Sequence, residues 1–433
     1  MIRNLAAACC ILGLVLAHAR AAPLPLEKLE AAYVVLGGDG PVARVVYTGK
    51  SACPSLSLDG AAKQMGMRLG PQTSTKFPVL VCELLIPSGT ASVMLGKLSL
   101  PLPPATLASA AVLGDTGCRL AHGMAQVCAL NLNIGNPGCR IDQGHFQNCT
   151  DKWPFWNLAR NIAEMKPQVV LHVGDYIYRE SSKFNPHGDT WPTWQADFFG
   201  PAAPLLAAAP WIAARGNHEI CTRQGNGFML FLDPTLAQNQ RPPSCVRLNP
   251  HFQVNVGSQT IFVVDSSNAS DSCGTSCDSP PYERQFKAMA ASGASGAWLL
   301  THRPAYGFLP SLSPINNTLQ GALEGWNGKL PPNFALALSG HVHLWEALSF
   351  ADRRAPQFVI GNGGTELDAA IQAPLDGAPI GGTTISSGKS ARTFGFTMLT
   401  PTTGSSGGWT ATAYGMDGTT WSCGVTANAV SCP

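Results

Sequence analysis

The stretch V-V-L-H-V-G-D-Y-I-Y at residues 169–178 constrains the fold of this chain more than any other. It begins with a short apolar, β-branched run, which is typical of a strand buried on both faces. Gly174 ends the predicted strand, so Asp175 lies at its carboxyl end, where open α/β sheets place their ligand-binding groups. Tyr178 follows and can point into the same crevice. Because Asp is also a common turn residue, the interpretation depends on whether the pattern recurs.

Four more predicted strands end in residues of the same kind. The five strand ends carry these candidate site residues, in chain order: Asp115; Asp175 and Tyr178; Asn217 and His218; His302; and His341 and His343. Carboxylates, imidazoles, an amide oxygen and a phenolate form a mixed oxygen and nitrogen donor set that suits iron, zinc or manganese. If one carboxylate is shared, seven side chains can serve two metal ions, which can hold a bridging hydroxide and clamp a phosphate.

The order of these blocks carries a family resemblance. The blocks G-D-x-G, G-D-x-x-Y, G-N-H-E, a strand ending in His, and G-H-x-H stand in the order found in the metallophosphoesterases, the calcineurin-like superfamily. Within that superfamily the chain resembles the purple acid phosphatases, over about residues 110–364. Most of the superfamily has D-x-H in the first block, whereas Gly117 stands in place of that histidine here. Tyr178 is available to replace the missing ligand.

The resemblance implies a role for each block. It places Asp115, Tyr178 and His343 on a first metal ion, expected to be Fe(III). It places Asn217, His302 and His341 on a second, divalent ion (Zn, Mn or Fe), with Asp175 bridging the two. His218 would face the phosphate, where it would orient the substrate or protonate the leaving oxygen. The predicted catalytic residues are therefore His218 and Asp175.

Other residues near these blocks leave alternatives open. Family members often carry a further substrate-binding histidine after the one equivalent to His302, and none occurs here between Arg303 and Leu330. Arg179 and Arg303 lie next to ligands and could contact phosphate, but surface ion pairing is an equal alternative. Trp191 and Trp194 could line the substrate rim, although packing is the more common role of Trp.

The predicted fold is of the α/β class, a four-layer αββα metallophosphoesterase sandwich preceded by a small β-sandwich-like N-terminal domain. The N-terminal domain is expected at 22–106, where the runs 33–36 and 42–47 flank G-G-D-G in a typical hairpin pattern. The catalytic domain is expected at 107–433. It should include a C-terminal β-hairpin, formed by 394–399 and 409–414, that pairs with the catalytic sheet.

The N-terminus and the cysteines indicate export. Residues 1–21 are typical of a secretory signal peptide, with Arg3 before an apolar run. Twelve of the 14 cysteines lie beyond it, an even number that suits disulfides in a secreted or periplasmic protein. We expect pairing between near neighbours: Cys53 with Cys82, Cys118 with Cys128, Cys139 with Cys149, Cys221 with Cys245, Cys273 with Cys277, and Cys423 with Cys432.

Taken together, these features predict an exported, binuclear metal-dependent phosphatase that hydrolyses phosphomonoesters by attack of metal-bound hydroxide. One alternative is a phosphodiesterase or nucleotide hydrolase on the same site. A second is a non-catalytic, metal-containing surface or binding protein. The net charge of +2 and the 12% of charged residues offer no attraction to nucleic acid or to an anionic membrane. The expected partner is therefore a small phosphorylated substrate, and the oligomeric state is left open.

Overall fold

The computed structural model describes residues 27–119, 126–128, 139–141, 149, 153–180, 185–239, 241–273, 277–315, 317–403 and 407–433. The predicted signal peptide lies outside the described residues. Among the helices that are described, none is both long and apolar enough to cross a membrane.

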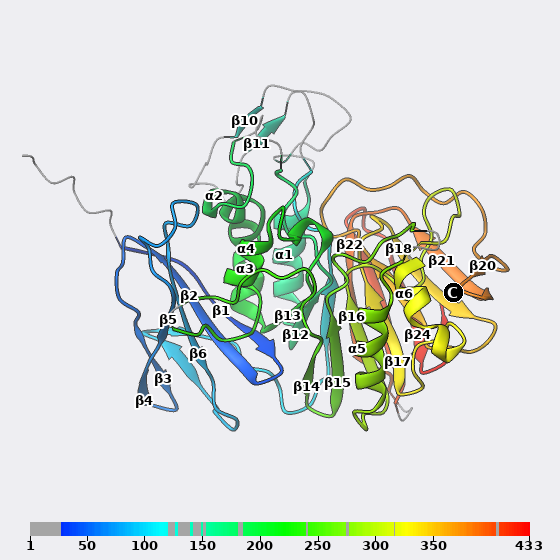
Figure 1. Ribbon diagram of the computed structural model, residues 1–433, viewed down its shortest axis with the longest axis horizontal. Coiled ribbons are helices and arrows are strands. Elements are labelled where there is room, and N and C mark those ends of the chain that lie inside the picture. Colours follow the sequence, from blue (N-terminus) through cyan, green and yellow to red (C-terminus); the bar gives the residue numbers. More distant parts are fainter. Residues whose placement is uncertain are drawn as a thin grey trace, which may run out of the picture.

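Two large sheets lie at the centre of the molecule (Figure 1). The first sheet has 11 strands in the spatial order β25 (Ala429–Ser431), β24 (Thr420–Thr426), β23 (Trp409–Gly415), β22 (Gly395–Pro401), β9 (Ala110–Leu113), β12 (Val169–His172), β13 (Trp211–Ala213), β1 (Lys28–Gly37), β2 (Gly40–Thr48), β6 (Leu80–Leu85) and β5 (Gly66–Leu69). The central strands β9, β12, β13 and β1 run parallel, whereas β22 is antiparallel to β9. The pairing of β22 and β23 with this sheet confirms the predicted C-terminal hairpin.

The second sheet has eight strands. Their order is β14 (Phe252–Val256), β15 (Gln259–Val264), β16 (Ala297–Thr301), β17 (Phe334–Ser339), β19 (Gln357–Ile360), β18 (Trp345–Phe350), β21 (Thr383–Ala391) and β20 (Pro379–Ile380). Strands β15, β16, β17 and β19 are parallel neighbours. Two small sheets complete the strands: β4 (Ala61–Gln64), β3 (Ser55–Leu58), β7 (Val93–Leu95) and β8 (Leu98–Ser99), and the pair β10 (Gln126–Cys128) and β11 (Cys139–Ile141).

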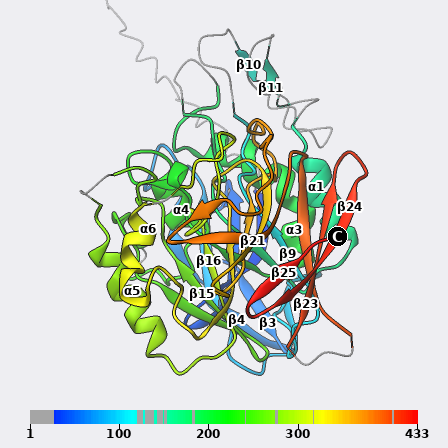
Figure 2. The same cartoon turned by 90° about the vertical axis from the view of Figure 1, so that its right-hand side faces the viewer.

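Helices cover the outer faces of both large sheets. The helices beside the first sheet are α1 (Phe155–Glu164), α2 (Trp191–Trp194), the π-helical turn η1 (Gln195–Phe199), α3 (Gly200–Ala208) and α4 (Gly225–Phe231). Those beside the second are α5 (Pro280–Ala290) and α6 (Asn317–Ala322), and the short 3-10 turns are η2 (Asn217–Glu219) and η3 (Glu324–Trp326). In Figure 2, α5 and α6 lie on the opposite side from the red C-terminal strands β23 to β25.

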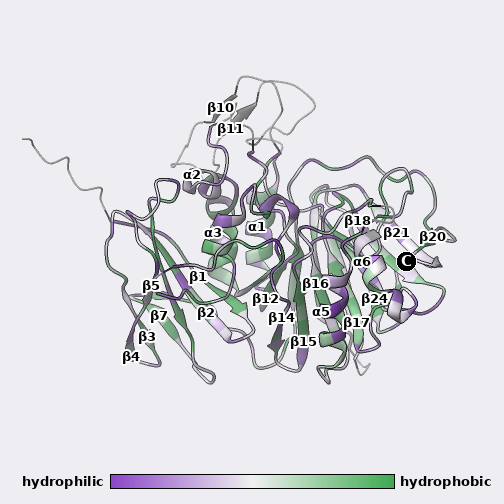
Figure 3. Ribbon diagram, in the orientation of Figure 1, coloured by the Kyte–Doolittle hydropathy of each residue, from purple (hydrophilic) through white to green (hydrophobic). Residues whose placement is uncertain are grey.

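The alternation of side chains along the strands creates the layers. In β9, Ala111 and Leu113 pack in the core that contains α1, while Ala110 and Val112 pack in the core between the sheets. In β16, Leu299 packs in the core that contains α5, while its neighbours face the first sheet. Strands buried on both faces must be apolar throughout, and the central strands are largely green in Figure 3. The layer order confirms the predicted αββα sandwich.

The N-terminal region is strand-rich, as predicted, and the expected hairpin forms β1 and β2. Four of its strands belong to the first large sheet, because Val35 of β1 pairs in parallel with Trp211 of β13. Residues such as Tyr33 and Val34 are completely buried in cores that they share with the catalytic region. The boundary at 106/107 therefore crosses a continuous sheet, and separate domains remain a prediction.

The disulfides confirm most of the predicted pairing and correct one part of it. Four bonds form as expected: Cys53–Cys82, Cys221–Cys245, Cys273–Cys277 and Cys423–Cys432. Cys118 bonds to Cys149, so the predicted bonds Cys118–Cys128 and Cys139–Cys149 are wrong. The physical reason is a hairpin between them, since β10 and β11 pair with Cys128 opposite Cys139. This hairpin leaves the two outer cysteines to meet at its base.

Candidate metal centre

Five loops at the carboxyl ends of strands bring the predicted ligands together. The loops follow β9, β12 and β13 in the first sheet, and β16 and β17 in the second. Parallel neighbours end at the same edge of a sheet, so residues far apart in the chain meet there. Five of the seven predicted ligands are buried and two are half-buried: Asp115, Asp175, Tyr178, His302 and His343 in the first class, Asn217 and His341 in the second.

One group of donors surrounds the Tyr178 hydroxyl. This oxygen lies 3.1 Å from Asp115 Oδ1, 2.9 Å from Asp175 Oδ2 and 3.1 Å from His343 Nε2. A phenol has one proton to donate. One proton cannot serve three acceptors at once. The three acceptor atoms and the hydroxyl oxygen therefore form a set of potential metal ligands that converge on one point.

A second group surrounds His302. Its Nε2 atom lies 2.9 Å from Asn217 Oδ1 and 3.2 Å from Asp175 Oδ2. Candidate ligand atoms of Asp175, His302 and His341 all lie within 4.8 Å of one another. The same Asp175 oxygen therefore contacts both groups, which is the arrangement expected of a shared ligand.

The hydrogen bonds behind the imidazoles determine which ring nitrogens can bind a cation. His302 Nδ1 lies 2.8 Å from the carbonyl oxygen of Val173, and His343 Nδ1 lies 2.9 Å from that of Glu366. A carbonyl only accepts hydrogen bonds, so each Nδ1 carries the proton and each neutral ring turns an unprotonated Nε2 toward the centre. His302 Nε2 and Asn217 Oδ1 are then two acceptors in contact with no proton between them. A cation satisfies such a pair, and the residues therefore fit a metal centre.

The backbone holds the two central carboxylates in place. Asp115 and Asp175 have φ values of 54° and 57°, in the left-handed region, which Asp tolerates better than most residues. One oxygen of each accepts a backbone N–H at 2.9 Å, from His341 and His218 respectively. A Cβ on Gly216 would lie 2.0 Å from Asp175 Oδ1, so this position requires glycine.

Gly117, the departure from the wider superfamily pattern, lies against the backbone of the next block. A Cβ at this position would lie 2.6 Å from the carbonyl oxygen of Tyr176. A histidine cannot be accommodated there without moving the strand end that carries Asp175. The hydroxyl of Tyr178 instead reaches Asp115 and His343.

Glu219 organises the loop that carries Asp175. Its buried carboxylate accepts backbone N–H groups from Gly216 and Asp175, both at 3.1 Å, and from Tyr176 at 2.9 Å. A fourth bond comes from Ile177 at 3.3 Å. Burial, and then the charge of Asp175, raises the pKa of Glu219 well above its ordinary value. This residue ties the second and third blocks together.

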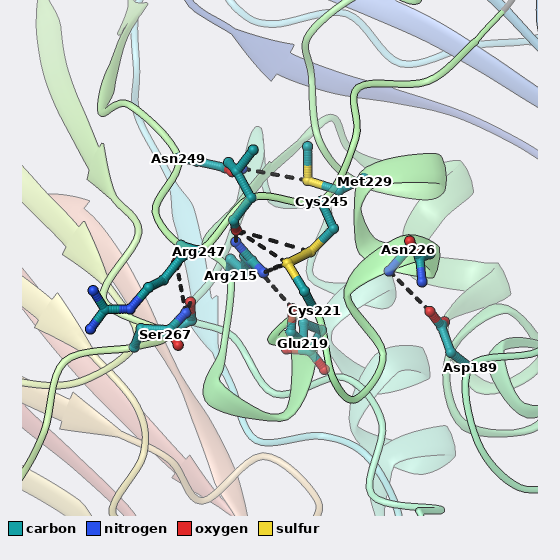
Figure 4. Close-up of a disulfide and its surroundings, with 12 residues drawn as sticks. Asp189, Arg215, Glu219, Cys221, Asn226, Met229, Cys245, Arg247, Asn249 and Ser267 are labelled. Carbon is teal, nitrogen blue, oxygen red and sulfur yellow. Dashed lines mark hydrogen bonds between the residues drawn. A yellow bond between two sulfur atoms is a disulfide. The ribbon is translucent and has the colours of Figure 1, made fainter.

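Arg215 fixes the other side of the same loop (Figure 4). Its Nε donates to the carbonyl oxygen of Glu219 at 2.8 Å, and its Nη1 pairs with Asp265 at 3.0 Å. Its Nη2 lies 3.0 Å from Sγ of Cys245, which is bonded to Cys221. A buried guanidinium and a disulfide thus hold the segment that presents Asn217 and His218.

Without a bound cation, the acidic groups at the centre disfavour ionisation of one another. Burial, and then the charge of Asp175, raises the pKa of Asp115 well above its ordinary value. Burial alone would raise the pKa of Asp175, but His302 and His218, in the protonated form that they can take when no cation is bound, hold it well below its ordinary value. Burial, then Asp175 and Asp115, raises the pKa of Tyr178 well above 10. Cations bound here would favour the ionised carboxylates and the phenolate.

His218 lies beside the donor groups and reaches solvent. Its ring packs on Tyr178 with centroids 4.0 Å apart, and its side chain is 17% exposed. Nδ1 lies 2.8 Å from a carboxylate oxygen of Glu180, and Nε2 lies 4.0 Å from Asp175 Oδ2. The imidazole is therefore available to a molecule that binds over the centre.

The structure distinguishes among the four residues for which both substrate contact and a structural role were open. Arg179 is completely buried and pairs with Asp197, so its charge is directed away from solvent. Trp191 and Trp194 are packed in the core beside α3. Arg303, in contrast, extends to the centre, where its Nη1 lies 2.9 Å from His341 Nε2.

Sequence reasoning missed two acidic residues of the site. Glu219 stands in the G-N-H-E block, so its place in the motif could have indicated it. Asp271 lies in a loop beyond the end of β15, and its Oδ2 lies 2.8 Å from His341 Nε2. No local pattern marks Asp271, because only the fold brings this loop to His341.

The αββα fold and the convergent donor set define a phosphoesterase-type hydrolase with a candidate metal centre. A family model for calcineurin-like phosphoesterases matches residues 109–344, more than half of the chain. The chain therefore belongs to the calcineurin-like phosphoesterase family, which confirms the predicted superfamily and class of enzyme. Metal binding by the individual side chains remains a prediction.

Among solved structures, the chain is similar to a purple acid phosphatase from yellow lupin (Lupinus luteus) seeds. The TM-score is 0.57 and the identity 14%, over 91% of this chain and 73% of that chain, and at this identity the likeness shows a shared fold. GAP50, the anchor in the inner membrane complex of Plasmodium, matches with TM-score 0.42 and 13% identity over 72% of this chain and 86% of that chain. A dimetal phosphatase from Danio rerio matches with TM-score 0.36 and 10% identity over 72% and 96%. A search of curated protein sequences finds no significant match.

Proposed function

We propose that this chain is an exported, binuclear metal-dependent phosphatase of the purple acid phosphatase type that hydrolyses small phosphomonoesters. The observation that carries the proposal is the position of Asp175 Oδ2, 2.9 Å from the Tyr178 hydroxyl and 3.2 Å from His302 Nε2. A buried carboxylate oxygen between two converging donor groups suits a ligand shared by two cations. The five disulfides among the described residues support export.

Each donor group would hold one cation. Asp115, Tyr178 and His343 would hold the first, and Asn217, His302 and His341 the second, with Asp175 on both. Two cations in this centre would polarise a phosphate ester and activate water as the nucleophile. We propose Fe(III) for the first, because a phenolate is a hard anionic ligand, and Zn, Mn or Fe for the second.

The chain's own residues would orient the ester and protonate its leaving group. His218 is partly exposed beside Asp175, and its Nδ1 lies 2.8 Å from a carboxylate oxygen of Glu180. The imidazole Nε2 would then face a bound phosphate ester, where it can donate a hydrogen bond or a proton to the leaving oxygen. The backbone N–H groups of His341 and His218, which donate to Asp115 and Asp175, would keep both carboxylates oriented during this step.

Asp175→Asn tests the proposed centre. A neutral amide cannot balance two cations, so both metal ions should lose occupancy and turnover of an aryl phosphate should fall by more than about 100-fold. The measurements are metal content by elemental analysis and initial rates after loading with iron and zinc. Asp278→Asn, which removes an exposed carboxylate paired with Arg247, is the control and should change neither.

Each alternative predicts a different outcome of that experiment. Near-normal metal content and turnover in Asp175→Asn would contradict the shared-ligand assignment. A metal-loaded wild type that prefers a bis-aryl diester to the monoester would support the phosphodiesterase. Full metal content with no hydrolysis of either ester would support a metal-containing binding protein.

Tyr178→Phe tests the identity of the first cation. A phenolate bound to Fe(III) absorbs visible light, so the oxidised, iron-loaded wild type should be pink to violet and the variant should lose this band. Spectra at matched iron content measure the effect. Tyr414→Phe is the control, because Tyr414 stacks on Phe396 on the first sheet. A band that survives Tyr178→Phe would remove this residue from the ligand set.

A further inference from the structure

Arg303 directly follows the predicted ligand His302 and extends into the same centre. Its backbone N–H donates to Ser266 Oγ at 2.7 Å, and this hydroxyl also accepts a hydrogen bond from Thr301 at 2.7 Å. The loop after β16 is thus anchored to the end of β15. The anchored backbone directs the guanidinium toward β17 and His341.

The guanidinium forms a cluster with one acidic and one imidazole group. Arg303 Nη1 lies 2.9 Å from His341 Nε2 and forms an ion pair with Asp271 Oδ2. The same Asp271 oxygen lies 2.8 Å from His341 Nε2. The side chains of Arg303 and Asp271 are 14% and 33% exposed, so the pair lies where the centre opens to solvent.

We propose that Arg303 is a phosphate-binding residue and that Asp271 is its positioning residue. This inference rests on the proposed function. When His341 uses its Nε2 lone pair for a cation, the N–H of Arg303 that now points at this atom is released into the same space. A guanidinium offers several donors in a planar arrangement that matches the oxygens of a phosphate.

The charge of Arg303 also indicates the class of substrate. A phosphomonoester dianion has three terminal oxygens, whereas a diester has two and one negative charge. A fixed cation beside the metal centre therefore stabilises a bound monoester more than a bound diester. Arg303 would provide, with His218, the phosphate contacts beyond those of the cations.

The test compares the full-length, metal-loaded wild type with Arg303→Gln, Arg303→Lys and Asp271→Asn. Arg247→Gln is the matched control, because Arg247 is 68% exposed, pairs with the exposed Asp278 and is not among the candidate site residues. Calorimetry gives the affinity for inorganic phosphate, kinetics give KM and kcat for an aryl monoester and its diester, and elemental analysis gives the metal content. Thermal melting verifies that each variant is folded.

We expect Arg303→Gln to weaken phosphate binding and raise the monoester KM by about 10- to 100-fold, the effect of losing a charged hydrogen bond. The diester KM should change by less than about threefold, and metal content should be unchanged. Arg303→Lys should restore part of the affinity because it restores the charge. Asp271→Asn should raise the monoester KM with little change in kcat, because Arg303 remains but is less well positioned.

Several results would overturn the inference. One is unchanged phosphate affinity in Arg303→Gln, another is an equal loss for monoester and diester, and a third is loss of the second metal ion. Phosphate binding requires no turnover, so this measurement separates the two proposals. If the loaded wild type hydrolyses neither ester but loses phosphate affinity on Arg303→Gln, the proposed function fails while the role of Arg303 stands.

Discussion

At the scale of single residues, Glu346 on β18 is a completely buried carboxyl group that is not among the candidate ligands. Its Oε2 accepts the backbone N–H of Phe308 at 3.2 Å, and within the described part of the chain Oε1 has no hydrogen-bond partner. Burial raises the pKa of Glu346 to about 8. The folded state therefore favours the neutral acid, and ionisation opposes folding.

Glu346→Gln should change how stability depends on pH. Because the folded pKa lies above the unfolded one, the contribution of Glu346 to stability is fully present below about pH 4.5 and is lost as the pH rises through about 8. Glutamine keeps the acceptor and never ionises. The variant should be more stable than the wild type at pH 8.5 by up to about 5 kcal/mol, since each unit of the pKa difference between about 4.5 and about 8 corresponds to about 1.4 kcal/mol.

Urea unfolding at pH 5, 7 and 8.5 measures this effect. Glu324→Gln is the control, since Glu324 is exposed in η3, and its curve should follow the wild type. Equal destabilisation of Glu346→Gln at all three pH values would show that Glu346 is ionised in the folded protein.

At the scale of elements, the loop between β13 and α4 connects the centre to both sheets. Glu219 accepts N–H groups from the loop after β12, and Arg215 reaches Asp265 after β15. The disulfide Cys221–Cys245 packs against Arg215 at the far side of the loop. Asn217 and His218 lie between these anchors, so their positions depend on the whole loop.

Removal of the Cys221–Cys245 bond tests this dependence. Replacement of both cysteines by serine should lower the free energy of unfolding by about 3 kcal/mol, from the entropy of the reopened loop. The variant should also bind the second metal ion more weakly, because the loop that presents Asn217 is less constrained. Denaturant unfolding and metal titration measure the two effects.

The disulfide Cys423–Cys432, at the edge of the first sheet between β24 and β25, provides the control. Its replacement by two serines should lower stability and leave metal affinity unchanged. If both double variants bind metal like the wild type, the loop is held without its disulfide.

At the scale of the whole molecule, the N-terminal strands support the catalytic region from one end of the first sheet. Arg44 and Arg68 are buried and both pair with Glu83. Arg44 Nη1 donates to the carbonyl oxygen of Phe231 at 2.8 Å, at the C-terminal end of α4, where a cation is favourable. Since α4 follows the loop that carries Asn217, these strands help to fix the position of the centre.

Much of the centre could be predicted because its signals are local in sequence. A buried strand appears as a short apolar run, and the polar residue after it lies at the sheet edge whatever the neighbouring strands are. The sequence therefore predicts the ends of β9, β12, β13, β16 and β17 together with the candidate ligands that follow them. The even number and spacing of cysteines likewise predicted four of the five disulfides that the described residues form.

Only the tertiary structure decided which distant segments meet. Val35 joins Trp211 and so places the N-terminal strands in the first sheet, and Cys118 joins Cys149 across the hairpin of β10 and β11. Asp271 reaches His341 because its loop leaves the second sheet beside Arg303. The physical reason is that such contacts depend on sheet order and on packing between layers. Sheet order and packing between layers leave no periodic pattern in the sequence around the residues that meet.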